Sequence, residues 1–307
     1  MAYPAASGFN QNAGTLVPQT WAARLLANYY AATCLHSICN TNQVNLIKDQ
    51  GDTVIIRTTP TIAIKSGYKK GQKLEYDQPL TDRIELLIDK GDVYGFVIDD
   101  IDEKQSDVMF TDEWLIDATE QFKISVDRQA FSLVYPDAHA KNKGANSGKI
   151  TGMYNMGAAG APLAIDKNNA IDVIVNVNSV LTEQNVPKPG RWIVIPDWMR
   201  NKLMTSEIRQ VQITGDSVSP IRNGLIGRID DTDIYVSNLL PYATDSGHYC
   251  NHILAGHRDA ITFASQFVKN ESFRAQDTFG TRYRGLQVWG IKVVKPEALV
   301  DVFAYAA

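Results

Sequence analysis

Two β-patterned segments on either side of a lysine-rich stretch constrain the fold of this chain more than any other feature. Residues 52–64 read DTVIIRTTPTIAI and residues 74–89 read LEYDQPLTDRIELLID, with β-branched and apolar residues beside polar ones. The turn-rich stretch KSGYKKGQK, residues 65–73, connects them. The pattern predicts a long hairpin. Because two strands alone are marginally stable in water, we expect this hairpin to lean on something else, such as another subunit.

The tip of the predicted hairpin is basic. Its charged and aromatic residues are Lys65, Tyr68, Lys69, Lys70 and Lys73, followed by Glu75 and Asp77. Since Tyr68 is the one aromatic residue within the lysine-rich stretch, base stacking on a nucleic acid is disfavoured. Two interpretations remain open, a solvated loop and an electrostatic contact between subunits, and we treat all seven residues as candidates for the contact.

The N-terminal segment is poorly suited to water. Its first 47 residues contain one formal charge, Arg24, although charged residues make up 21% of the whole chain. Residues 1–17 lack periodicity and predict an extended arm. After Pro18, the spacing of Trp21, Leu25, Tyr29 and Leu35 predicts a helix up to about Ile38. We expect neighbouring subunits to cover this segment, so Trp21 and Arg24 join the contact candidates.

The remainder of the chain combines helices and strands. The longest helical pattern spans roughly residues 107–135, before Pro136. One face of it carries Leu115, Ala118, Phe122, Val126, Ala130 and Leu133. Residues 170–181 predict a second helix, RWIVIP at 191–196 predicts a buried strand, and Asp197 is expected to be the N-cap of the next helix. From Gly224 the chain is mainly strands separated by turns. The fold class is therefore α+β.

Composition excludes several classes of protein. With 307 residues, 44% of them hydrophobic, the chain can form one large domain or two closely joined ones. Its net charge of −4 provides no basic field to hold nucleic acid by counterion release. Three cysteines, Cys34, Cys39 and Cys250, give neither a disulfide framework nor a zinc motif. No apolar run reaches the length of a membrane span, so we expect synthesis in a reducing cytoplasm and no membrane partner.

The stretch GLIGRIDD, from Gly224 to Asp231, looks at first like a phosphate-binding glycine loop. A loop of that kind opens onto a helix and supplies a lysine to the phosphates, whereas this stretch has no lysine and continues into a strand pattern. Asp230 and Asp231 would also repel a phosphate. We therefore predict a glycine-shaped hairpin that turns at DDTD.

The stretch HYCNHILAGH, residues 248–257, faintly resembles a zinc protease motif because His248 and His252 are four residues apart and His257 follows. Tyr249 stands where the motif requires a glutamate, and the flanking residues indicate a strand. On a strand His248, Cys250 and His252 would share one face, which leaves adventitious metal binding open. We predict no functional metal site.

Two further groups of residues are explained without catalysis. Asp99, Asp100, Asp102 and Glu103 lack the glycine and distal glutamate of a calcium loop, and carboxylates are favourable ahead of a helix. Cys34 and His36 are two positions apart on a predicted helix, so their side chains should face different directions. We predict no catalytic residue and no cofactor.

The order of these segments resembles that of the major capsid proteins of tailed bacteriophages, which have the Hong Kong 97-type capsid fold. The resemblance covers nearly the whole chain. It implies an N-terminal arm and helix (1–50), an extended loop (51–90), a peripheral domain with a spine helix (91–150), an axial domain (151–270) and peripheral return strands (271–307). The VDRQAF stretch, 126–131, lies in the implied spine helix, and GLIGRIDDTDIYVSNLLP, 224–241, resembles a glycine-flanked hairpin of the axial domain.

The resemblance also implies a function. The protein would be the coat protein of an icosahedral head, found in the virion and assembled in the host cytoplasm, that encloses double-stranded DNA without sequence-specific binding. Its partners would be copies of itself in pentamers and hexamers, a portal and a decoration protein. Because the first helix comes almost at once, we expect the scaffolding protein to be separate. The alternatives are an encapsulin-type shell around protein cargo and, more distantly, a metal- or nucleotide-dependent enzyme.

Overall fold

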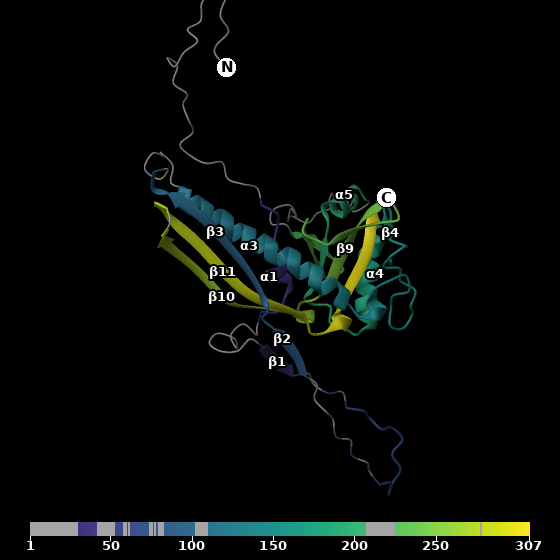
Figure 1. Cartoon of the computed structure of the whole chain (residues 1–307). Helices are drawn as coiled ribbons and strands as arrows, with labels where there is room; N and C mark the ends of the chain where they lie inside the picture. The colour runs from purple at the N-terminus through teal and green to yellow at the C-terminus, as the bar shows by residue number, and fades with distance from the viewer. Residues whose placement is uncertain are drawn as a thin grey trace, which may run out of the picture.

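Two β-sheets and one long helix organise the chain (Figure 1). The computed structural model describes residues 30–41, 53–57, 60, 62–73, 76, 78, 83–101, 110–206, 225–276 and 278–307. The helix α3, Phe110–Val134, lies along an elongated three-stranded sheet, and a seven-stranded sheet with two shorter helices lies beside its C-terminal end. A hairpin projects away from both sheets. No helix among the described residues is both long and apolar enough to cross a membrane.

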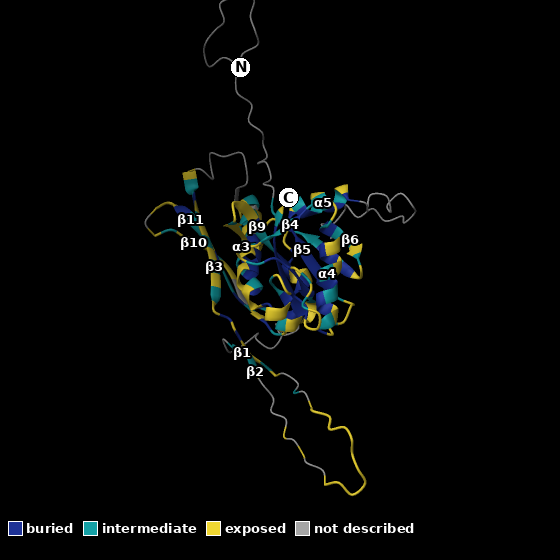
Figure 2. Ribbon diagram, turned by 90° about the vertical axis from the view of Figure 1, so that its right-hand side faces the viewer, coloured by how far each residue is buried: buried dark blue, intermediate teal, exposed yellow. Residues whose placement is uncertain are grey.

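The seven-stranded sheet contains the larger part of the buried core (Figure 2). Its order is β4 (Leu163–Ile165), β12 (Leu299–Ala306), β9 (His248–His257), β5 (Arg191–Ile195), β7 (Thr232–Val236) and β6 (Leu225–Ile229), and β8 (Tyr242–Asp245) also pairs with β9. Helices α4 (Ala170–Glu183) and α5 (Asp197–Thr205) accompany it. The helix predicted at 170–181, the strand at 191–196 and the hairpin turning at DDTD are confirmed.

Strand β5 shows how both faces of this sheet are covered. All five of its residues are buried, and because side chains alternate along a strand, they enter two different cores. Trp192 and Val194 belong to the cluster shared with α3, whereas Ile193 and Ile195 pack with α4 and α5. A strand covered on both faces reads as a continuous apolar run, as RWIVI does.

The three-stranded sheet has the order β10 (Ile261–Arg274), β11 (Gly280–Val293) and β3 (Lys90–Asp99), all antiparallel. A register shift interrupts the β10–β11 ladder between Ser265 and Phe267. β3 is an edge strand of this sheet. The sequence analysis predicted no strand over these residues, so β3 is an element that it missed.

Helix α3 confirms the predicted long helix, with one error in the predicted face. Val126 and Ala130 are buried as expected, but Leu133 is 43% exposed, whereas Phe131 and Val134 are buried in its place. The helix ends at Val134, one residue before the 3-10 turn η2 (Tyr135–Asp137) that contains Pro136.

Between β9 and β12 the chain crosses between the two sheets twice. It leaves β9 through the 3-10 turn η5 (Arg258–Ala260) into β10, and it returns from β11 through η6 (Pro296–Ala298) into β12. The Val294 amide donates to the Ala260 carbonyl at 2.8 Å and ties the two crossings together. β10 and β11 therefore lie in the three-stranded sheet, and β12 lies in the seven-stranded sheet.

The base of the projecting hairpin is β1 (Thr53–Arg57) paired with β2 (Arg83–Leu87). Val54, Leu86 and Ile88 form a small core with Ala264 of β10, which anchors the hairpin on the three-stranded sheet. The hairpin is confirmed, but the long strands are not, since each strand has five residues and the described residues between them form none.

Two predictions about helix starts are wrong. Within the described part of the N-terminal region, helix α1 covers only Leu35–Ile38 and residues 30–34 are not helical. Asp197 is the first residue of α5, and Pro196 occupies the N-cap position without a side-chain cap. The predicted arm, with Trp21 and Arg24, lies outside the described residues.

Candidate intersubunit contact surfaces

The tip of the hairpin projects as an exposed loop (Figure 2). Lys65, Lys69, Lys70 and Lys73 are all exposed, and Tyr68 is 64% exposed. The Gln72 amide donates to the Lys69 carbonyl at 2.9 Å to close a turn, and Gly71 within it has a φ of 86°, which favours glycine. The structure thus brings the five predicted tip residues together on one loop. Glu75 and Asp77 lie outside the described residues.

Large apolar side chains accompany these lysines. Ile62 is 71% exposed, Ile64 is 91% exposed and Tyr76 is 87% exposed. Sequence reasoning did not single them out, although the alternation TIAIK, residues 61–65, is typical of a half-buried strand. Apolar side chains gathered on one protruding segment are a mark of a protein contact surface.

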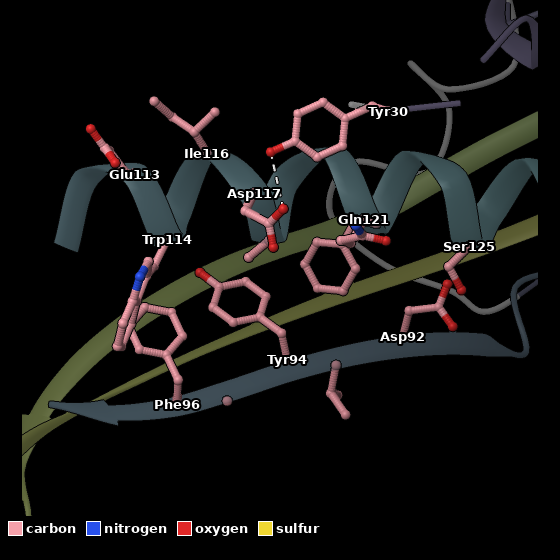
Figure 3. A pocket seen from close by; sticks show the side chains of 14 residues that line it. Tyr30, Asp92, Tyr94, Phe96, Glu113, Trp114, Ile116, Asp117, Gln121 and Ser125 are labelled. Atoms are coloured by element: carbon pink, nitrogen blue, oxygen red, sulfur yellow. Dashed lines mark hydrogen bonds between the residues drawn. The ribbon is translucent and has the colours of Figure 1, made fainter. Parts of the chain in front are cut away.

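A second surface is a groove of about 1060 Å³ between β3 and α3 (Figure 3). Aromatic rings form its apolar wall. The rings of Phe96 and Trp114 meet edge to face with centroids 5.5 Å apart, and Tyr94 lies 5.2 Å from Phe122. These contacts hold the helix away from the strand and leave the groove open between them.

The groove is acidic. Asp92, Glu113 and Asp117 line it, and its described lining contains no Lys, Arg or His. Asp92 accepts hydrogen bonds from Gln129 Nε2 at 2.9 Å and from Trp289 Nε1 at 3.3 Å, so its carboxylate is fixed. The Tyr30 hydroxyl donates to Asp117 at 3.0 Å across α3 (Figure 3). Sequence reasoning missed this site because Asp92 of β3 meets Glu113 and Asp117 only when α3 packs on β3.

The acidic run that follows β3 has a structural role in its described part. Arg274 Nη1 and Nη2 each lie 2.6 Å from an oxygen of the Asp100 carboxylate, a bidentate pair that links the end of β3 to the end of β10. The Ile101 amide donates to Asp99 at 2.9 Å. Asp102 and Glu103 lie outside the described residues.

The histidine stretch forms no catalytic arrangement. His252 Nδ1 lies 3.0 Å from Asp301, and its ring stacks on Tyr135 with centroids 4.0 Å apart. Burial raises the pKa of Asp301 more than the histidine lowers it. His248 stacks instead on Tyr305. Across the described residues, no three His, Cys, Asp or Glu side chains gather in a way that could hold a metal ion.

The other two enzyme-like motifs also have structural explanations. Cys34 is buried, and burial, reinforced by the nearby Asp127 charge, raises the pKa of its thiol, which disfavours the nucleophilic thiolate. After Gly224, the chain forms β6 and β7 around a turn at Asp230 and Asp231, which have φ values of 46° and 61°. A helix N-terminus that could bind phosphate is not formed there.

The sequence matches no protein-family model and no curated protein. Solved structures match it over nearly its whole length. A structure from Mycobacterium phage Che8 has a TM-score of 0.74 at 26% identity and covers 95% of this chain and 97% of its own. The capsid of cyanophage P-SCSP1u has a TM-score of 0.68 at 17% identity, with 99% and 98% covered, and the capsid of Ralstonia phage GP4 has 0.66 at 14%, with 98% and 99%.

The chain has the capsid fold of tailed bacteriophages. These structures and this chain match over 95% or more of both lengths, so the likeness is one of the whole fold and not of a fragment. The resemblance drawn from the order of the segments is therefore confirmed at the level of the fold. Within the described residues, the exposed loop tip and the α3–β3 groove are the candidate contact surfaces.

Proposed function

We propose that the protein is the major capsid protein of a tailed bacteriophage and that its copies assemble into the icosahedral head around double-stranded DNA. The observation that carries this proposal is the two-way match to phage capsid structures over nearly the entire chain. The described surface supports it physically, since the extended loop exposes Ile62, Ile64 and Tyr68 on a segment that has no core of its own.

In this proposal the parts of the chain have distinct roles. The seven-stranded sheet with α4 and α5 is the axial domain around the centre of pentamers and hexamers. The α3 helix and the three-stranded sheet form the peripheral domain, and residues 51–90 overlap an adjacent subunit. Trp21, Arg24, Lys65, Tyr68, Lys69, Lys70, Lys73, Glu75 and Asp77 are the proposed contact residues. Repeated heterologous contacts of this kind close into rings and shells even where each is weak.

The proposed partners follow from the same role. They are a separate scaffolding protein, a portal and a decoration protein. The net charge of −4 suits a wall that does not attract phosphate, provided that a motor drives the DNA inside.

Electron microscopy tests the proposal directly. The chain expressed with its scaffolding protein should yield polyhedral shells, and shells filled with DNA in infected cells. Particles that contain protein cargo in place of DNA would favour the encapsulin alternative. Particles of neither kind, together with stoichiometric zinc or tight nucleotide binding, would refute the proposal.

Deletion of residues 65–73 tests the role of the loop. The tip contacts no part of the buried core, so the variant should remain folded, with wild-type circular dichroism, but should assemble poorly. Normal shells from this variant would remove the loop from the assembly contacts.

A further inference from the structure

Another cavity, separate from the α3–β3 groove, lies where the N-terminal segment meets the crossing turn η5. Its volume is about 450 Å³, which is within the range of small-ligand sites. Three parts of the chain supply its described lining, namely residues between His36 and Thr41, Tyr235 of β7, and Arg258 with Asp259 of η5. Apart from the buried Cys39, every described lining residue has a polar side chain or a polar end. The cavity therefore suits a small polar ligand.

Hydrogen bonds hold the backbone around this cavity. The Asn40 amide donates to the Ile261 carbonyl at 2.9 Å, and the Phe263 amide donates to the Asn40 carbonyl at 3.1 Å. These two bonds tie the N-terminal segment to the start of β10. On the turn, the Asp259 amide donates to His257 Nδ1 at 3.2 Å. The lining residues are thus positioned before a ligand arrives, which lowers the entropic cost of binding.

Arg258 and Asp259 are neighbours in the sequence, but their charges do not pair. Within the described structure, the Arg258 guanidinium donates no hydrogen bond and forms no ion pair. An Asp259 carboxylate oxygen lies 3.7 Å from His257 Nδ1, beyond hydrogen-bond distance. That nitrogen accepts the Asp259 amide, and Nε2 of the same ring lies 2.9 Å from the Pro189 carbonyl, so the neutral ring has no proton left for the carboxylate. Both charged groups are available to a ligand.

The other side chains of the cavity are mainly hydrogen-bond donors. Each of the following can donate, and none forms a side-chain hydrogen bond with another described residue: His36, Ser37, Thr41 and Tyr235. Asp259 is the one acceptor-only side chain of the described lining. A complementary ligand is therefore an anion with several acceptor oxygens and one hydroxyl. Hydrogen phosphate has this combination, since its oxygens accept charge-assisted hydrogen bonds and its P–OH donates one.

We propose that this cavity binds a hydrogen phosphate ion, with Arg258 and the surrounding donors on its oxygens and with Asp259 accepting the hydrogen bond of its P–OH. The site goes beyond the proposed function, because it is complete in one subunit and does not depend on assembly. Bound there, the ion joins the N-terminal segment to the crossing turn. Sulfate and phosphodiesters carry no proton at neutral pH, so Asp259 repels them.

Calorimetric titration of unassembled subunits with inorganic phosphate tests the site. Wild-type protein should bind one ion per subunit, and Arg258→Gln should raise the Kd at least about tenfold because it removes charge-assisted hydrogen bonds. Arg258 is exposed, so this variant should fold. Lys167→Gln changes the net charge equally at an exposed position outside the described lining and should leave the Kd unchanged. No saturable binding by wild type, or an equal Kd in Arg258→Gln, would overturn the proposal.

The choice of anion tests the role of Asp259. Wild-type protein should bind phosphate at least about tenfold more tightly than sulfate, because only phosphate has a hydroxyl to donate to the carboxylate. Asp259→Asn should lose most of this preference, since an amide can donate to sulfate. Equal affinities of wild type for the two anions would overturn the assignment. Tighter binding of a deoxynucleoside 5′-monophosphate or of an unphosphorylated oligonucleotide would assign the cavity to nucleic acid and overturn it as well.

Hydrogen exchange tests whether the ion joins the two segments. At a phosphate concentration of about ten times the Kd, an opening that destroys the site should become about elevenfold rarer. Exchange of the Asn40 and Phe263 amides should slow by about that factor in wild type and stay unchanged in Arg258→Gln. Unchanged exchange of both amides in wild type at this phosphate concentration would overturn the joining of the two segments.

Discussion

Removal of the Asp127 carboxylate should weaken the attachment of α1 to the long helix. Asp127 is buried on α3, and one of its oxygens accepts hydrogen bonds from the Cys34 amide at 2.8 Å and the Leu35 amide at 3.2 Å. Asp127→Ala leaves two buried N–H groups without an acceptor, at about 1–3 kcal/mol each. Because the second bond is long, we expect the free energy of unfolding to fall by about 2–4 kcal/mol in total.

Asp127→Asn separates the hydrogen bonds from the charge. The amide retains an acceptor oxygen for both N–H groups, so it should cost less than alanine. Burial raises the pKa of Asp127 more than its two backbone hydrogen bonds lower it. A raised pKa in the folded state means that wild-type protein loses stability as the pH rises from about 4, the ordinary value, through the raised one. Over that window the stability of Asp127→Asn should therefore improve relative to wild type.

Chemical unfolding of unassembled subunits between pH 4 and pH 8, followed by tryptophan fluorescence, measures both variants. Hydrogen exchange at the Cys34 and Leu35 amides gives a local readout, since both should exchange faster in Asp127→Ala alone. An alanine variant within about 0.5 kcal/mol of wild type, as for an ordinary surface substitution, would refute the reasoning, and so would a pH dependence of the opposite sign for asparagine.

Three further substitutions test the fold. Gly290→Ala places a Cβ against the Leu87 carbonyl, so it should displace the base of the hairpin and lower the free energy of unfolding by about 1–3 kcal/mol. Thermal unfolding measures this, and an unchanged melting temperature would contradict it. Arg191 is 1% exposed, and its guanidinium donates hydrogen bonds to Thr182 Oγ1 and to three backbone carbonyls. Because the single ammonium of a lysine cannot make all of these bonds, Arg191→Lys should lower the free energy of unfolding by about 2–4 kcal/mol, measured by chemical unfolding. Glu183 accepts hydrogen bonds from the Thr151 hydroxyl and from the Ile150 and Thr151 amides, and these bonds, the hydroxyl's first, lower the pKa of Glu183. Glu183→Gln should speed hydrogen exchange of both amides above pH 5, whereas equal exchange rates would show that the carboxylate does not hold this loop.

Local patterns predicted much of this fold because several elements bury one clear set of residues. The run RWIVI and the helix at 170–181 each occur where the sequence places them, since a fully buried strand and an amphipathic helix leave strong periodic signals. β3 escaped detection because its inward residues Tyr94 and Phe96 alternate with the apolar Val93 and Val97, so no polar face marks the period. Similarly, the pairing of β12 with β9 could not be predicted, because sheet membership depends on long-range pairing.

Of the two candidate surfaces, one was predictable from the sequence and the other was not. The basic tip was predictable, since Lys69, Lys70 and a glycine turn are adjacent in the sequence. The acidic groove was not, because Asp92 and Asp117 come from different elements and meet only when α3 packs on β3. Contacts of this kind require the tertiary arrangement, which no local period encodes.

The double crossing between the sheets has a mechanical consequence. The chain passes from one sheet to the other through Arg258–Ala260 and back through Pro296–Ala298, so two of the covalent connections between the sheets lie in these turns. The hydrogen bond from Val294 to Ala260 keeps the connections side by side. Two adjacent connections resist rotation of one sheet against the other more than a single connection would. In a shell built from such subunits, these connections would help to keep the two sheets of each subunit in register.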